Sequence, residues 1–363
     1  GGVNAKITDI NGGQLSNRNL FVNGGARIAQ RGTSETGVTS SGYKTVDQFK
    51  VGLASLGTWT VSQETDAPAG FSNSLKMDCT TADSSPAAND VCAIDTFVEA
   101  QNLQVLEYGS ASAVAATLSF YVKSNKTGSG TVSILQDDNS NRCINVSYTI
   151  SSANTWERKT ISLPADASGV INNDNGRGFI IEYWLNSGST YTGGSAQTDW
   201  GSLDNTNRNF ANLGIGGSTD DYWMITGVQL EVGEVATAFE HRSVGDELLR
   251  CYRYYYRTNP ANGAMFGTGF QYSATSVLGL ISFPVPMRAN VTAVEQSGTA
   301  SDYGVIGSQS TVTNTAVPSY GGDANDRVLN VNFTISSGSF STGDAVFLRS
   351  RDNDAYLGFS AEL

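Results

Sequence analysis

Alternation of apolar and polar residues is the sequence feature that most constrains this fold. It recurs in widely separated runs, and the clearest of them are residues 118–122, 144–150, 179–185, 223–232 and 329–335. A period of two places the apolar side chains on one face, which is typical of half-buried β-strands and not of helices. Clusters of Gly, Asn, Asp and Ser separate the runs and favour turns. The pattern therefore predicts an all-β chain with an antiparallel sandwich or barrel.

One segment has the signature of a helix rather than a strand. Ser243 and Asp246 have capping-box spacing, so the Ser243 side chain can accept from a backbone N–H while Asp246 reaches back. An apolar stripe follows them. We predict a short linking helix over residues 243–257, although the tyrosine-rich run 252–256 also fits the first strand of a following domain.

This helix divides the chain into regions of different character. Residues 1–42 are rich in Gly, Asn and Thr and contain only short apolar pieces, which favours an extended N-terminal arm held by neighbours. Residues 43–242 contain most of the alternating runs and form the predicted main β domain. Residues 258–363 form a second β domain, in which Pro284 and Pro286 favour an edge strand or a bulge.

The charge of the chain excludes several classes of function. Its 363 residues include 22 Lys and Arg against 34 Asp and Glu, a formal net charge of −12. Such an acidic chain is a poor partner for nucleic acid, and it lacks the basic clusters that dock on anionic membranes. No apolar run is long enough to span a bilayer. We therefore expect neither nucleic-acid binding nor membrane insertion.

Cysteine and histidine are too sparse for most metal and disulfide frameworks. The cysteines are Cys79, Cys92, Cys143 and Cys251, none of them in a C-x-x-C pair, and His241 is the single histidine. We expect buried free thiols, with a Cys79–Cys92 bridge as the alternative. We expect neither a metal site nor a cofactor.

No motif for nucleophilic or phosphate chemistry is present, so we assign no catalytic residue. His241 is the one candidate for a catalytic base, but its place between a strand and a helix favours a bond to backbone or to Glu240. The acid pairs 137–138 and 220–221 could serve glycoside hydrolysis or bind calcium. They lie in turn clusters, however, where Asp bonds locally. We expect a protein that is not an enzyme.

Aromatic residues around a polar loop give the main indication of ligand binding. Tyr191, Trp200, Phe210 and Tyr222 flank residues 187–221, a stretch rich in Gly, Ser, Thr and Asn. Aromatic rings stack on the C–H faces of sugars while polar side chains bond the hydroxyls. These residues are therefore candidate glycan contacts. The alternative is that the rings pin the long loop to the sandwich.

An apolar cluster in the helical segment predicts an oligomer. Leu248, Leu249, Tyr252 and Tyr255 would form an adhesive stripe on a monomer. Packing such helices about a threefold axis would bury the stripe. We therefore expect a homotrimer with these residues at the interface.

Several strings resemble a family of marine bacteriophage virion proteins, the fibre or appendage proteins of cyanophage-like and pelagiphage-like podoviruses. They are SNRNLFVNG (16–24), AQRGT (29–33), YKTVDQF (43–49), LSFYVKS (118–124), TWERKT (155–160), TGVQLEVG (226–233), ATAFEHRS (236–243), DELLRCYRYY (246–255) and FPVPMR (283–288). The resemblance covers the chain from about residue 16 to 290. Ala238, where many relatives have proline, departs from the pattern and affects the strand-to-helix turn rather than an activity.

The resemblance implies a specific fold, assembly and function, whereas the alternation predicts only the class of fold. It implies a jelly-roll domain akin to carbohydrate-binding modules, followed by a C-terminal β module. It also implies a trimer at the surface of a virion, attached to tail or capsid. We expect such a protein to contact other virion proteins through its N-terminal arm and to recognise a host-surface glycan during adsorption. The family supplies no catalytic residues.

Three hypotheses of function follow from these observations. The first is a non-enzymatic virion fibre that binds a host glycan. The second is a purely structural appendage or capsid-decorating protein. The third is a depolymerase, which needs two carboxylates in a cleft.

Overall fold

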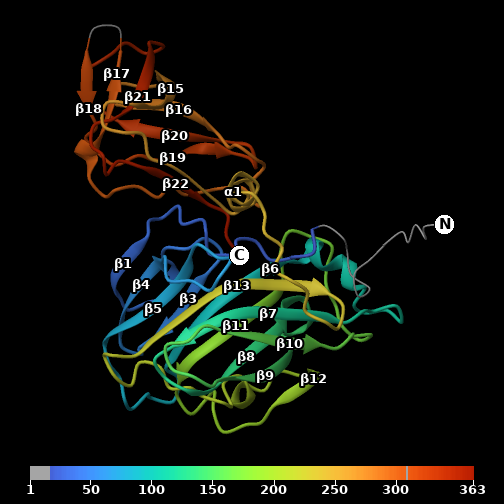
Figure 1. The fold of residues 1–363 in the computed structure, drawn as a ribbon. Helices are drawn as coiled ribbons and strands as arrows, with labels where there is room; N and C mark the ends of the chain where they lie inside the picture. The colour runs from blue at the N-terminus through green and yellow to red at the C-terminus, as the bar shows by residue number, and fades with distance from the viewer. Residues whose placement is uncertain (1–16, 308–309) are drawn as a thin grey trace, which may run out of the picture. The chain divides into compact units, whose positions relative to one another are not determined.

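A computed structural model describes residues 17–307 and 310–363, and the chain divides into two compact units (Figure 1). The first unit ends at Glu247 and also includes Leu363, whereas the second runs from Leu248 to Glu362. Strands dominate both units, and the few helices are short. Among the residues that the structure describes, no helix is long and apolar enough to cross a membrane.

The first unit is a sandwich of two antiparallel sheets. The six-stranded sheet contains, in spatial order, β1 (Ser34–Val38), β4 (Thr58–Glu64), β5 (Ser74–Thr81), β13 (Tyr222–Val232), β7 (Ala116–Ser124) and β10 (Glu157–Leu163). The seven-stranded sheet contains β12 (Gln197–Gly201), β9 (Arg142–Ile150), β8 (Gly128–Gln136), β11 (Arg177–Ser187), β6 (Val91–Glu99), β3 (Lys50–Ala54) and β2 (Gly42–Tyr43). Short 3-10 helices lie between strands: η1 (Ala100–Leu106), η2 (Asp137–Asn139) and η3 (Asn205–Asn207). The predicted antiparallel jelly-roll sandwich is confirmed.

Alternation explains how the two sheets close on one core. In β7, the side chains of Leu118, Phe120 and Val122 are fully buried in the core. The residues between them point to the other face of the sheet, where Tyr121 is half-buried. Phe120 makes edge-to-face contacts with Tyr148 of β9 and Tyr183 of β11, at 5.5 and 5.2 Å between ring centroids. Such aromatic pairs add specificity to the area that they bury. The alternating runs of the first unit therefore became strands because one face of each could join this core.

Residues 17–42 belong to the sandwich rather than to an extended arm. Phe21 and Ala26 are fully buried, and β1 pairs with β4 at the edge of the six-stranded sheet. The backbone of this segment runs along β13, where Leu20 N–H donates to the Leu230 carbonyl at 2.8 Å. The side chain of Asn19 bonds the β13 backbone as well. A polar sequence can be buried here because its amides satisfy main-chain groups. Residues 1–16 of the predicted arm lie outside the described residues.

The long connection between β11 and β13 packs on the seven-stranded sheet. The Ser133 hydroxyl donates to the carbonyl of Arg208 at 2.8 Å, and the Arg208 guanidinium pairs with Glu182 of β11. Asp95 of β6 lies directly opposite Glu182 in the strand register. Loss of solvation around this carboxyl, together with the Glu182 charge, raises the pKa of Asp95 to about 7.

The predicted helix cap is present. Asp246 N–H donates to the Ser243 hydroxyl at 3.1 Å, and that hydroxyl donates to the Asp246 carboxylate at 2.7 Å. The helix α1 (Val244–Tyr252) is shorter than the predicted 243–257, because the chain re-enters a strand at β14 (Tyr255–Thr258). The division between the two units falls within α1.

The second unit is a curled antiparallel sheet with a small additional ribbon. The sheet contains, in spatial order, β18 (Thr311–Thr313), β17 (Tyr303–Ile306), β21 (Ala345–Ser350), β15 (Met265–Gln271), β16 (Ser276–Ser282), β20 (Val328–Thr334) and β19 (Ser319–Ala324). The ribbon pairs β14 with β22 (Leu357–Ser360), and a 3-10 helix, η4 (Ala300–Asp302), precedes β17. Pro284 and Pro286 fall just after β16 ends, where no ladder hydrogen bond is required of them.

The residues predicted at an oligomer interface have different environments. Tyr255 is fully buried in its own unit, and its hydroxyl donates to Glu295 at 2.8 Å. Tyr252 is half-buried and meets Tyr256 edge to face at 5.1 Å, and Leu248 is also half-buried. Leu249 is 47% exposed. Tyr255 is therefore a core residue rather than an interface residue, because β14 turns its ring inward.

The cysteines Cys79, Cys92, Cys143 and Cys251 are buried free thiols, as predicted. Burial raises the pKa of the Cys79, Cys92 and Cys143 thiols above the ordinary value for cysteine. A protonated, enclosed thiol is a poor nucleophile. These cysteines act as small apolar side chains.

Candidate functional site

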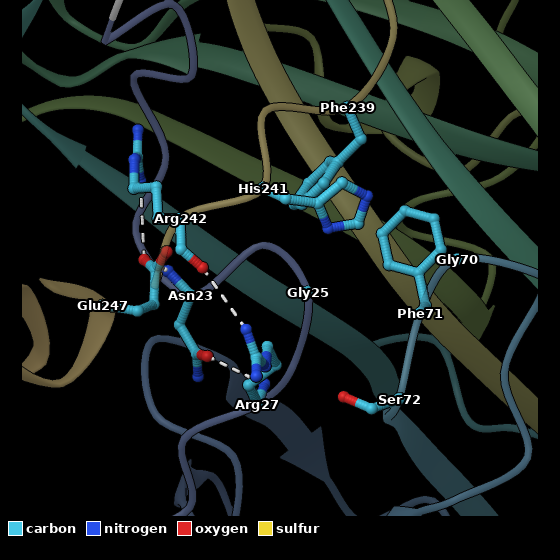
Figure 2. Close-up of a pocket in the computed structure, with 10 residues that line it drawn as sticks. All are labelled: Asn23, Gly25, Arg27, Gly70, Phe71, Ser72, Phe239, His241, Arg242 and Glu247. Atoms are coloured by element: carbon cyan, nitrogen blue, oxygen red, sulfur yellow. Dashed lines mark hydrogen bonds and ion pairs between the residues drawn. The ribbon is translucent and has the colours of Figure 1, made fainter. Parts of the chain in front are cut away.

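A pocket of about 310 Å³ in the first unit combines aromatic rings with charged side chains (Figure 2). It is lined by Asn23, Gly25, Arg27, Gly70, Phe71, Ser72, Phe239, His241, Arg242 and Glu247. These residues come from the segment before β1, the β4–β5 connection, and the segment from β13 into α1. We call this hollow the ring pocket.

Three rings form one wall of the ring pocket. The centroid of Phe71 lies 4.9 Å from that of Phe239 and 5.2 Å from that of His241, and Phe239 and His241 are 4.9 Å apart. Phe71 and Phe239 are half-buried, whereas His241 is exposed. His241 therefore contributes a ring face to a pocket. Within the part of the chain that the structure describes, its side chain makes no hydrogen bond to backbone or to Glu240, the partners expected from the sequence.

A glycine beneath the rings makes this wall possible. Gly227 has φ +64° and lies in an irregular stretch of β13. A Cβ atom there would lie 2.8 Å from both the Phe71 Cζ and the Tyr121 Cδ2 atoms. Phe71 and Tyr121 are 5.3 Å apart between centroids. The missing side chain thus lets the β4–β5 connection lay Phe71 directly over the strand.

Asn23 builds the opposite, polar wall. It is fully buried and has the left-handed φ of +61°. Its side-chain NH₂ donates to the carbonyls of Ile28 and Asp47 at 2.9 and 2.8 Å, and its side-chain oxygen accepts from Arg27 N–H and Ile28 N–H at 3.0 Å. One amide therefore closes the loop that carries Arg27.

An ion-pair network fixes the end of the ring pocket nearest α1. Arg242 pairs with Glu240 at 3.1 Å and with Glu247 at 3.5 Å, and Glu247 also accepts from Asn23 N–H. Burial alone would raise the pKa of Glu240. Hydrogen bonds from the backbone N–H groups of Asn19 and Arg18, with the Arg242 charge, instead hold that pKa below its ordinary value. Both carboxylates are thus already partnered.

Arg27 is the exposed charged group of the polar wall. Its guanidinium donates to the Arg242 carbonyl at 3.3 Å. Figure 2 shows Arg27 on the side of the pocket opposite Phe71 and His241. Gly25 lies between them, and a Cβ atom there would meet Arg27 and Phe239 carbons at ordinary contact distances of 3.7 to 3.8 Å. The absence of a side chain leaves room between the two walls.

A larger hollow of about 800 Å³ has fewer groups that could recognise a ligand. It lies at the ends of β7, β10 and β13, and its lining consists of Ala113, Val114, Ala115, Ser162, Pro164, Ala165, Val232, Gly233, Glu234 and Val235. It has no aromatic ring and a single charged side chain. Specific ligand sites combine apolar walls with convergent polar groups. The ring pocket fits that description better.

The structure does not bring the predicted glycan contacts together. Trp200 is 8% exposed, its indole N–H donates to the Pro164 carbonyl at 2.8 Å, and its ring packs on Tyr108. Trp200 is therefore a core residue, because β12 turns it inward at the sheet edge. Tyr191 stacks beside Trp184 at 5.2 Å, with the Arg208 guanidinium over both rings.

The other two predicted contacts also lie outside the ring pocket. Phe210 is half-buried in the same connection, after η3. Tyr222 belongs to the opposite sheet, where Lys76 lies over its ring and its hydroxyl bonds Asn154. Trp200 and Tyr191 fit the alternative prediction, in which rings pin the long loop to the sandwich.

The paired acids are engaged in local bonds. Asp137 pairs with Arg177 at 3.0 Å, and Asp138 accepts from the backbone N–H and the side-chain NH₂ of Asn172. Asp221 accepts from backbone N–H groups of its own turn. Within residues 17–307 and 310–363, no group of three or more His, Cys, Asp or Glu side chains is placed to hold a metal ion.

In sequence, no family model matches the chain, and no curated protein matches it. In structure, the chain has distant similarity to a phage tailspike and to carbohydrate-binding jelly rolls. The enzymatically active domain of bacteriophage CBA120 tailspike protein 4 gives a TM-score of 0.31 at 12% identity, over 59% of this chain and 21% of that one. The chain thus spans about a fifth of that tailspike domain.

Two carbohydrate-binding modules illustrate the second similarity. A family 61 module in complex with β-1,4-galactotriose gives a TM-score of 0.27 at 12% identity, over 59% of this chain and 99% of that one. The CBM22-1 xylan-binding domain from Paenibacillus barcinonensis Xyn10C gives 0.27 at 8% identity, over 56% and 94%.

Proposed function

We propose that the ring pocket binds a sugar unit of a glycan. One observation carries the proposal: a wall of packed rings faces polar side chains held on a rigid loop. The C–H faces of a sugar pack against aromatic rings, while guanidinium and hydroxyl groups bond its hydroxyls. At about 310 Å³ the pocket is near the lower end of ligand-site volumes, so it suits a short stretch of a glycan chain.

The test is binding by the whole chain to a panel of neutral and acidic polysaccharides, measured by affinity electrophoresis. We expect Phe71→Ala to weaken binding about 10-fold or more, because the variant removes the ring in the middle of the wall. Phe270→Ala is the matched control, since Phe270 is an exposed ring of the second unit. Equal retardation of the wild type and Phe71→Ala would contradict the proposal.

The same experiment separates binding from cleavage. A non-enzymatic protein leaves the polysaccharide intact, so no new reducing ends form on prolonged incubation. New reducing ends would instead favour the depolymerase hypothesis. Retardation without cleavage is the result that we expect.

We also propose that the protein is a virion surface component that recognises its host through this glycan. The phage-like strings of the sequence and its polar, charge-poor composition support this assignment. We further propose a homotrimer, with Leu249 as the remaining exposed candidate of the four interface residues. Light scattering should then give a mass about three times 38.3 kDa. A monomeric mass would contradict the trimer and favour a decorating protein.

A further inference from the structure

Arg27 is a cation without an anion, in a chain whose net charge is −12. Four other arginines of the first unit have carboxylate partners: Arg142 with Asp166, Arg177 with Asp137, Arg208 with Glu182, and Arg242 with Glu240 and Glu247. Within the described residues Arg27 makes no ion pair, and its guanidinium makes one hydrogen bond, to the Arg242 carbonyl. A guanidinium has five N–H donors in a planar fork, so most remain available.

The loop fixes where this charge lies. Arg27 N–H donates to the Asn23 side chain, and the next residue, Ile28, is buried. The side chain of Arg27 is exposed on the polar wall, and Figure 2 shows it across the pocket from Phe71, with its guanidinium directed at the Arg242 carbonyl. A ligand lying against the rings would therefore have its far edge at the guanidinium.

The carboxylates of the pocket do not cancel this charge. Glu247 accepts from Arg242 and from Asn23 N–H, and Glu240 accepts from Arg242 and from two backbone N–H groups. Each acid is thus held by groups other than Arg27. The open face of the pocket presents a positive charge although the whole chain is acidic.

We infer that the ring pocket selects an acidic sugar, a uronate whose carboxylate binds the Arg27 guanidinium while its ring packs on Phe71. The inference rests on the proposed glycan binding and adds the chemical class of the sugar. A planar carboxylate matches the guanidinium fork with two parallel hydrogen bonds. A neutral hydroxymethyl group at the same position offers neither the charge nor the second oxygen.

The experiment compares polymers that differ in this one group. Polygalacturonate, alginate and hyaluronate are each tested beside their carboxyl-reduced forms, in which the carboxylate has become a hydroxymethyl group. We expect the wild type to bind at least one acidic polymer about 10-fold more tightly than its reduced form. Arg27→Gln should lose this preference while binding the reduced form as the wild type does. Arg27→Lys should restore part of it, because a point charge replaces the fork.

Each outcome bears on one of the two proposals. If Arg27→Gln keeps the full preference, or if the wild type prefers no acidic polymer, the inference is overturned. Loss of binding to all polymers in Phe71→Ala would still leave the ring pocket as a glycan site. If Phe71→Ala binds every polymer as the wild type does, the proposed function itself fails. Arg27 is exposed, so Arg27→Gln should unfold at the wild-type temperature.

Discussion

The two units each have a hollow of similar size beside aromatic rings, but the hollows differ in chemistry. The ring pocket has a volume of about 310 Å³, and a hollow on the second unit has about 270 Å³. The latter, which we call the apolar hollow, is lined by Thr268, Gly269, Phe270, Leu278, Gly279, Leu280 and Asn330. Its lining contains no charged side chain. Size therefore does not distinguish the two.

The difference lies in how polar groups are held. In the ring pocket, buried Asn23 fixes a loop and presents Arg27 to three packed rings. In the apolar hollow, Phe270 and Leu280 are 46% and 54% exposed, and Asn330 donates to Asp323 at a long 3.4 Å. Convergent donors can orient a ligand, whereas exposed apolar side chains offer contact without direction. Exposed rings alone therefore do not indicate a ligand site.

The largest effect is expected from removing the Asn23 side-chain amide, which holds the polar wall of the ring pocket together. We expect Asn23→Ala to lower the free energy of unfolding by about 3–5 kcal/mol, because it orphans buried backbone groups and leaves alanine with a left-handed φ. Urea denaturation measures the loss. Asn330→Ala is the control and should change stability by less than about 0.5 kcal/mol. Equal effects would show that the two hollows are built alike.

A second prediction concerns the strand beneath the rings. Gly227→Ala should destabilise the chain by about 2–4 kcal/mol, since the new Cβ overlaps Phe71 and Tyr121 at a positive φ. Thermal unfolding measures this change, and glycan affinity should fall with it because Phe71 moves. For stability, Gly25→Ala is the matched control, because its Cβ meets only ordinary contacts. A wild-type melting temperature in Gly227→Ala would refute the packing argument.

A third prediction concerns the pH dependence of the stability of the sandwich, which should depend on Asp95 and not on the ring pocket. The pKa of Asp95 is about 7 in the folded protein and about 4 in an unfolded chain. Between these values the folded state keeps a proton that the unfolded state has released, so stability falls as pH rises from about 4 to about 7. Asp95→Asn should reduce the loss of stability between pH 5 and pH 8 by about 2–3 kcal/mol.

Urea denaturation at pH 5, 6.5 and 8 measures that difference between Asp95→Asn and the wild type. Binding to a neutral glycan at fixed pH should be unchanged in the variant, because Asp95 lies on the seven-stranded sheet and not in the ring pocket. A parallel pH profile in the two proteins would argue against an elevated pKa for Asp95.

The smallest expected effect lies on the apolar hollow. Phe270→Ser and Leu280→Ser should each change the free energy of unfolding by at most about 0.5 kcal/mol, because both side chains are exposed. Chemical denaturation measures stability, and light scattering measures mass. A large loss of stability, or a change in mass, would show that this surface is covered and would remove the contrast with the ring pocket.

Much of the fold could be predicted from the sequence because alternation is a local signal. The run around Phe120 became β7, and the Ser243 cap began α1 where the spacing placed it. The segment around Asn23 could not be recognised. Its burial depends on amide side chains that bond the backbone of β13 and of its own loop, and such partners leave no periodic pattern.

The candidate site was largely missed for a different reason. Phe71 lies in a Gly- and Ser-flanked turn, and it meets Phe239 only because two distant connections cross over β13. His241 was singled out as a lone histidine, but its neighbours were not apparent. Trp200 was chosen for its place in a polar loop, although β12 turns it into the core. Composition of a loop does not reveal which way its rings face.

Labelling of the buried cysteines can measure how often the folded protein opens locally. A thiol reagent reaches a buried, protonated Cys92 or Cys143 only when the surrounding strands separate. The rate of labelling in the folded protein therefore reports the frequency of local opening around each thiol. A cysteine introduced on the surface would react ahead of them, so a fluorophore could be attached beside the ring pocket without first removing the native residues.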